Sequence, residues 1–81
     1  MQERKYDEYN GQLIMEGEYL NGERNGIIKE YGINGSLLFI GEYINGRKNG
    51  KGKKYYDKRK IKFEGEYLDG NRWNGKYYNP D

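Results

Sequence analysis

The chain has 81 residues, enough for one small domain, and its thirteen aromatic residues with a net charge of only +2 indicate a folded rather than a disordered protein. It contains no cysteine and no histidine, which excludes disulfides, thiolate nucleophiles and the usual ligands of zinc. No apolar run is long enough to span a membrane or to form a signal peptide, so we expect a cytoplasmic protein.

Seven short strands are predicted in chain order, near residues 4–9, 12–20, 26–31, 36–44, 51–56, 60–68 and 75–78. No segment has apolar residues at helical spacing, and glycine recurs too often for a helix. Pairs that tolerate the positive φ of tight turns follow three of the strands, namely Asn21-Gly22, Asn45-Gly46 and Asp69-Gly70. A second set of turn signals follows a basic residue at Asn25-Gly26, Asn49-Gly50 and Asn74-Gly75, the last displaced by one extra residue, Trp73. This spacing predicts successive β-hairpins.

One segment occurs three times at intervals of 24 residues, at positions 16–22, 40–46 and 64–70. Side chains alternate between the faces of a strand, so an even interval keeps equivalent residues on the same face. We expect the core face to carry the columns Leu13, Leu37 and Ile61; Met15, Phe39 and Phe63; Gly17, Gly41 and Gly65; and Tyr19, Tyr43 and Tyr67. The glycine column leaves room for aromatic rings over the backbone. The opposite face is expected to carry Glu18, Glu42 and Glu66.

Within each copy the pattern is Gly-Glu-Tyr, two residues, Gly, and then a basic residue before Asn-Gly, with a later tyrosine at Tyr31 and Tyr55. This pattern resembles the MORN repeat over residues 13 to 78, in the tyrosine-containing form of bacterial antitoxin-like proteins. The resemblance implies scaffolding or protein binding and, in some members, contact with anionic membrane lipids.

The expected fold is all-β: a single-layer antiparallel meander of hairpins, twisted or curved, without helix. One domain over residues 1–81 would comprise copies near 13–35, 37–59 and 61–78, preceded by an edge strand near 4–9. Because such a sheet is thin and has two open edges, we expect strong curvature, or a homodimer formed through a face or an edge.

Positive charge is concentrated in residues 47–62, which contain nine basic residues and one acidic residue, a local charge of +8. Residues 1–46 carry a charge of −4 and residues 63–81 a charge of −2. The basic segment could attract an acidic protein or an anionic lipid surface, or it could simply keep the sheet soluble. Nucleic acid is not expected, because aromatic rings on a core face cannot stack on bases. The candidate partner-binding residues are Arg47, Lys48, Lys53, Lys54, Lys58, Arg59, Arg72 and Trp73.

Two further features have competing interpretations. Trp73 beside Arg72 could anchor a partner, but we favour a ring that folds back and caps the core face of the last hairpin. Equivalent glutamates among Glu18, Glu42 and Glu66 should lie about 9–10 Å apart, two strands away, at the outer limit of an inverting glycosidase pair. Repetition alone explains such a column.

The sequence therefore predicts a non-catalytic protein-binding module: an adaptor, a scaffold or a small inhibitor. The alternative is a peripheral module that docks the basic segment on anionic lipid. A weaker third hypothesis is a small hydrolase that uses the glutamate column. We expect no cofactor and no metal.

Overall fold

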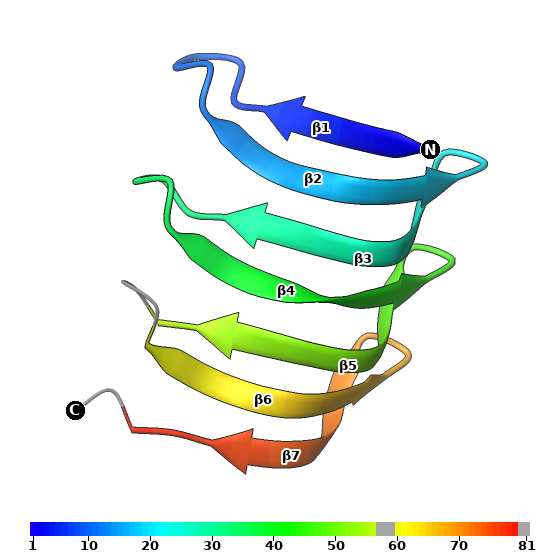
Figure 1. The fold of residues 1–81 in the computed structure, drawn as a ribbon, viewed down its shortest axis with the longest axis vertical. Helices are drawn as coiled ribbons and strands as arrows, with labels where there is room; N and C mark the ends of the chain where they lie inside the picture. Colours follow the sequence, from blue (N-terminus) through cyan, green and yellow to red (C-terminus); the bar gives the residue numbers. More distant parts are fainter. Residues whose placement is uncertain (57–59, 80–81) are drawn as a thin grey trace.

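The structure is a computed structural model that describes residues 1–56 and 60–79, and over these residues it forms one sheet of seven strands (Figure 1). The strands pair in chain order, each antiparallel to the next, which confirms the predicted all-β meander of hairpins. Their bounds are β1 Gln2–Tyr6, β2 Leu13–Leu20, β3 Glu23–Tyr31, β4 Leu37–Ile44, β5 Arg47–Tyr55, β6 Ile61–Leu68 and β7 Asn71–Tyr77. In the described part of the chain, no helix has the length and apolar character needed to cross a membrane.

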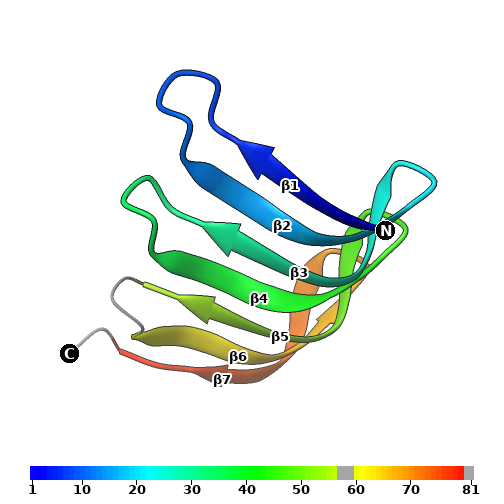
Figure 2. The same ribbon diagram turned by 45° about the horizontal axis from the view of Figure 1, so that its top comes forward.

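Two-residue turns join β2 to β3, β4 to β5 and β6 to β7. In the first of these turns, Asn21 has φ 52° and Gly22 has φ 80°, and the pairs at 45–46 and 69–70 have similar positive values. Positive φ at both central residues defines the type I′ turn, whose twist matches that of the flanking strands. Figure 2 shows the strands turning sharply just before and after these three turns.

The second set of Asn-Gly pairs does not form turns, so the predicted starts of β3, β5 and β7 are wrong by three or four residues. Asn25 and Gly26 lie inside β3, where the pairing with β2 shifts between Gly17 and Tyr19. Gly26 has φ 121° and Gly50 has φ 111°, values that glycine adopts in β-bulges. Asn-Gly supplies positive φ to turns and bulges alike, so the dipeptide could not distinguish them.

The bulges also tie each repeat to the next. The Asn25 side chain accepts a hydrogen bond from the backbone N–H of Asn45 at 3.2 Å, and Asn49 accepts one from Asp69 at 3.0 Å. Each asparagine therefore holds the two-residue turn of the following repeat. This bond explains why asparagine recurs at a bulge as well as in the turns.

The third repeat is shorter than the other two, not longer as the sequence alignment suggested. Gly75 pairs with Gly65 in the way that Gly52 pairs with Gly41, so Gly75 corresponds to Gly52 and not to Gly50. Trp73 then lies in a bulge that is one residue shorter than the corresponding bulge of β5. The sequence alone could not decide between an inserted and a deleted residue, because Gly75 can be aligned with either Gly50 or Gly52.

The core lies on one face of the sheet, which we call the aromatic face. Its buried residues are Tyr19, Ile28, Phe39, Tyr43, Phe63 and Tyr67. Phe39 and Phe63 are each only 1% exposed, and both pack edge-to-face against Tyr67, with ring centroids 5.5 and 5.6 Å apart. Edge-to-face packing brings the positive ring edge to the negative ring face, which stabilises the contact beyond simple burial. The expected aromatic columns are thus buried, together with Ile28, which the sequence analysis did not place there.

The column of Leu13, Leu37 and Ile61 was assigned to the wrong face. On β3 and β4, Glu30 pairs with Phe39 but Tyr31 pairs with Leu37, which leaves Leu38 as an extra residue. Directly paired residues point to the same side, so this bulge reverses the alternation and sends Leu37 to the face opposite Phe39. The same shift occurs before Met15 and before Phe63. We call this second side the opposite face.

Glycine at position 41 is required by a close approach of two strands. A Cβ at Gly41 would lie 2.6 Å from Cζ of Phe39 and 2.8 Å from Cα of Gly52 on β5. Both distances are shorter than carbon atoms tolerate. The glycine column therefore gives room to an aromatic ring, as expected, and also to the paired glycine of the neighbouring strand.

Candidate functional site

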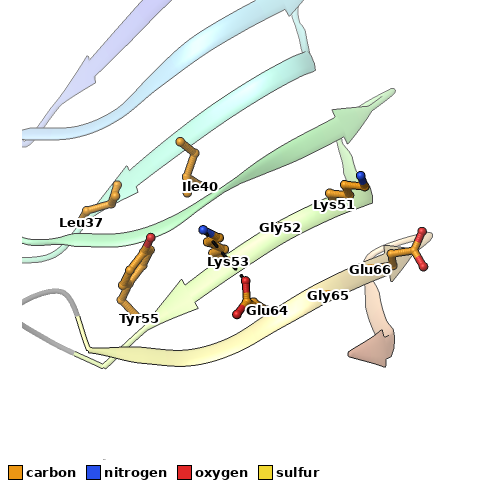
Figure 3. Close-up of a pocket in the computed structure, with 9 residues that line it drawn as sticks. All are labelled: Leu37, Ile40, Lys51, Gly52, Lys53, Tyr55, Glu64, Gly65 and Glu66. Carbon is orange, nitrogen blue, oxygen red and sulfur yellow. Dashed lines mark ion pairs between the residues drawn. The ribbon is translucent and has the colours of Figure 1, made fainter. Parts of the chain in front are cut away.

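A groove crosses β4, β5 and β6 on the opposite face and has a volume of about 680 Å³ (Figure 3). Its floor is the backbone of Gly52 and Gly65, which pair directly across β5 and β6. The side chains that line it are Leu37, Ile40, Lys51, Lys53, Tyr55, Glu64 and Glu66. The groove is therefore built from the middle of the repeat array.

The apolar part of the groove comes from Leu37, Ile40 and Tyr55. Leu37 reaches it because of the bulge at Leu38, which turns its side chain away from the core. Ile40 occupies the position where the other two repeats have Glu16 and Glu64. This replacement of an acid by isoleucine was the sequence signal for the groove, and the sequence analysis did not use it.

The polar part of the groove consists of two Lys-Glu pairs. Lys53 and Glu64 are directly paired across β5 and β6, and their charged atoms lie 4.0 Å apart (Figure 3). Tyr78 donates a hydrogen bond of 2.7 Å to the same glutamate, and this bond raises the pKa of the Tyr78 hydroxyl. Lys51 pairs with Glu66 in the sheet register. One wall of the groove therefore presents both signs of charge beside the apolar side chains.

The basic residues predicted as a binding segment do not share one surface. Strand alternation sends Lys51 and Lys53 to the opposite face, whereas Lys48 and Lys54 lie on the aromatic face. Arg47 donates a hydrogen bond of 3.1 Å to Asp69, both of them well exposed. Lys58 and Arg59 lie outside the described residues.

Instead, one cation of each repeat covers the aromatic face. Arg24, Lys48 and Arg72 are 24 residues apart and each lies over a ring. The closest contact is that of the Lys48 ammonium, 4.1 Å from the centroid of the Phe39 ring. Cations are attracted to the negative face of a ring, and their methylene stems shield it from water.

Trp73 does not cap the core, so the favoured interpretation of this residue is wrong. Its side chain is 64% exposed, which is incompatible with a ring folded onto the aromatic face. The end of the core is covered by Arg72, which lies over the rings of Phe63 and Tyr77 at 5.6 and 5.2 Å. Trp73 points elsewhere because it is the extra residue of a bulge.

The repeated glutamates have a structural role at the bulges. A Cβ at Gly50 would lie 2.6 Å from a carboxylate oxygen of Glu42, so this glutamate packs directly over the bulge glycine. Glu42 also accepts a hydrogen bond of 3.3 Å from the backbone N–H of Lys51. Glu18 accepts bonds from the chain's amino terminus and from Gln2, and the first of these lowers its pKa most. Within the described residues, no group of three acidic side chains lies close enough to hold a metal ion.

Two buried or partly buried tyrosines are tied to glutamates. Tyr31 donates a hydrogen bond of 2.6 Å to Glu16, and burial together with this bond raises the Tyr31 pKa to about 12. Tyr43 donates to the carboxylate of Glu30, and burial followed by this bond raises its pKa further. A phenol bonded to a carboxylate loses its proton reluctantly, because ionisation would bring two negative charges together.

A comparison of the chain with protein-family models, with curated proteins and with solved structures found no match. Function is therefore inferred from the geometry of the two faces.

Proposed function

We propose that this protein is a non-catalytic module that holds an extended segment of a protein partner in the groove across β4, β5 and β6. The observation that supports the proposal is the mixed lining of that groove, in which Leu37, Ile40 and Tyr55 lie beside two Lys-Glu pairs. Apolar floors with a few placed polar groups are typical of sites that bind other molecules. The resemblance to MORN repeats agrees with a protein-binding role.

A second feature supports display to a partner rather than chemistry. The three repeats carry an apolar residue at the same position, and each of these side chains is at least half exposed: Leu20, Ile44 and Leu68. Apolar side chains repeated along one edge of a small domain are more typical of interaction surfaces than of enclosed catalytic sites. Two of the glutamates weighed as catalytic groups, Glu18 and Glu42, pack over bulge glycines instead.

The proposal is tested by capture of partners from a lysate of the source cells with the immobilised chain, at low and at high salt. Ile40→Asp places a charge in the apolar part of the groove, and Ile33→Asp is its matched control, because Ile33 is 88% exposed in the β3–β4 connection. We expect proteins retained at high salt by the native chain and by Ile33→Asp to be lost with Ile40→Asp. Equal retention by all three chains, each shown to be folded by circular dichroism, would contradict the groove as the binding site.

Salt dependence and the Ile40→Asp variant also distinguish lipid docking from protein binding. Vesicles that contain anionic phospholipid should bind through exposed lysines in a salt-dependent way, without dependence on Ile40. Binding to such vesicles that is lost in a Lys53→Glu, Lys54→Glu, Lys58→Glu, Arg59→Glu variant, with no groove-dependent protein captured, would favour the lipid alternative over the proposal.

A further inference from the structure

Two neighbouring repeats place opposite charges at equivalent positions of the aromatic face. Tyr43 and Tyr67 are 24 residues apart, and so are Glu30 and Lys54. Their registers correspond, since Glu30 pairs with Phe39 and Lys54 pairs with the equivalent Phe63. Tyr43 donates its hydroxyl hydrogen bond to the carboxylate of Glu30. In the next repeat, the carboxylate that would accept from Tyr67 is replaced by an ammonium.

The hydroxyl of Tyr67 is left without an acceptor as a result. Within the described residues, this oxygen is buried and has no hydrogen-bond partner, and the whole residue is only 5% exposed. An ammonium group has no lone pair, so Lys54 cannot replace Glu30 as the acceptor. Buried hydroxyls in folded proteins almost always have a partner, which makes the position unusual.

Cations lie near the Tyr67 ring and on the neighbouring strands. The Lys48 ammonium lies 5.5 Å from the centroid of the Tyr67 ring. Lys54 has a lowered pKa, because it is partly buried and because Lys48, Lys62 and Arg72 lie near it. Burial raises the pKa of the Tyr67 hydroxyl, and the positive charge of Arg72 partly offsets this increase. Lys48, Lys54 and Arg72 therefore share this part of the aromatic face, whereas Lys62 lies over the ring of Tyr56.

One carboxylate lies close enough to act on the same groups. The Glu30 carboxylate raises the pKa values of both Lys54 and Tyr67, but less than the other groups near them change these values. It is also already bonded to Tyr43. The cation cluster thus exceeds the negative charge that the described chain supplies to it. A hydroxyl donor that lies beside cations is suited to bind an oxyanion.

We propose that Tyr67, Lys54 and Arg72 form a binding site for a carboxylate, supplied by an acidic side chain of the protein partner, which takes the place that Glu30 fills in the preceding repeat. This inference rests on the proposed protein-binding function and adds the chemistry of a second contact, on the other face of the sheet.

Entry to the site requires displacement of the side chains that cover the Tyr67 hydroxyl. Lys54 lies on β5 and Arg72 on β7, the two strands that flank β6, and both long side chains have several rotatable bonds. As these side chains swing aside, the entering carboxylate accepts a hydrogen bond from Tyr67 and pairs with the two cations. The chain shows that the aromatic face accommodates such a carboxylate, since Glu30 occupies the equivalent place.

The experiment is a titration of the isotope-labelled chain, followed by nuclear magnetic resonance, with a short neutral-capped peptide that contains one glutamate and with the same peptide that contains glutamine. We expect saturable shifts in the signals of Lys54, Tyr67 and Arg72 with the glutamate peptide, and at least about tenfold weaker binding of the glutamine peptide. Equal binding of both peptides would overturn the proposal.

Two variants with the same charge change locate the site. Lys54→Glu restores the arrangement of the preceding repeat, so Tyr67 gains an internal acceptor and the response to the peptide is lost. Lys5→Glu is the matched control, since Lys5 is exposed on the edge strand β1, far from β6 in the strand order, and it should keep the response. Loss of the response in both variants, or in neither, would overturn the assignment.

A third variant and a second probe complete the test. Tyr67→Phe keeps the ring packing and removes the donor, so the peptide should bind at least about tenfold more weakly. Inorganic phosphate tests the source of the oxyanion, because tighter saturation by phosphate than by the glutamate peptide would assign the site to a phosphate group and overturn the carboxylate. Groove-dependent capture that survives in Lys54→Glu would separate failure here from failure of the proposed function.

Discussion

The two faces of this sheet are made by alternate residues of the same strands, yet they differ sharply in burial and composition. Phe39 is 1% exposed on the aromatic face, whereas its neighbour Ile40 is partly exposed in the groove. The aromatic face is closed by its own rings and by one cation from each repeat. The comparison teaches that a single-layer sheet can bury its core on one face while the other stays open, so substitutions on the two faces should have separable effects on stability.

The largest expected difference is between Phe39→Ala and Ile40→Ala. The first leaves a cavity among Tyr43, Tyr67 and Lys48, and should lower the free energy of unfolding by about 3–5 kcal/mol, most of what a small domain has. The second should lower it by about 1 kcal/mol. Urea unfolding followed by circular dichroism measures both. Similar losses for the two variants would mean that the faces are not energetically distinct.

The next effect concerns the close approach of strands beneath the aromatic face. In Gly41→Ala the new Cβ would meet Phe39 and Gly52, so the ring or the strand must shift. We expect a loss of about 1–3 kcal/mol in the free energy of unfolding. Gly22→Asn is the control, because a side chain there meets open space and asparagine tolerates the turn conformation. Unchanged stability in Gly41→Ala would show that the ring and the neighbouring strand yield to the added Cβ without cost.

Within the aromatic face, two equivalent tyrosines should respond with opposite sign. Tyr43→Phe leaves the Glu30 carboxylate without its hydroxyl donor, and should lower the free energy of unfolding by about 1–2 kcal/mol. Tyr67→Phe removes a buried hydroxyl that has no partner among the described residues, and should leave stability unchanged or raise it slightly. Thermal unfolding of both variants in chloride buffer tests this contrast. Equal destabilisation would show that Tyr67 has an acceptor.

Alkaline pH should lower the free energy of unfolding, because tyrosines on both faces have raised pKa values. Tyr31, on the opposite face, has its pKa raised to about 12, and Tyr43 is raised by burial and by Glu30. A pKa raised on folding means that the unfolded chain loses its protons first, so stability is complete below about pH 10 and falls above it. Because Tyr31 is partly exposed, its share should not exceed about 1 kcal/mol. Ultraviolet titration of Tyr31→Phe should lack one late-ionising group, and an unchanged titration curve would contradict the assignment.

The smallest effect is expected at the exposed ion pair between Arg47 and Asp69. Arg47→Ala should change the free energy of unfolding by less than about 0.5 kcal/mol, because water and salt screen both charges. Denaturant unfolding at low and high salt gives the measurement. A loss comparable to that of Tyr43→Phe would mean that the turn of the third repeat depends on this pair.

Much of the fold was predictable because local chemistry and the fold agree. The type I′ turns required Asn-Gly or Asp-Gly, and Tyr19, Tyr43 and Tyr67 are buried as the alternation predicted. The candidate site was less predictable. Leu37 reached the groove only through a bulge, and a bulge adds one residue without a distinct sequence signature.

By itself, the sequence determined the number of strands, their order and the existence of one aromatic face, because a 24-residue period and turn dipeptides act through neighbouring residues. Only the tertiary structure decided which face Leu37 joins, where Trp73 points and which charges meet. Those features depend on the register between strands, and a shift of one residue exchanges the two faces of a sheet. The separation of Lys48 and Lys54 from Lys51 and Lys53 has the same origin.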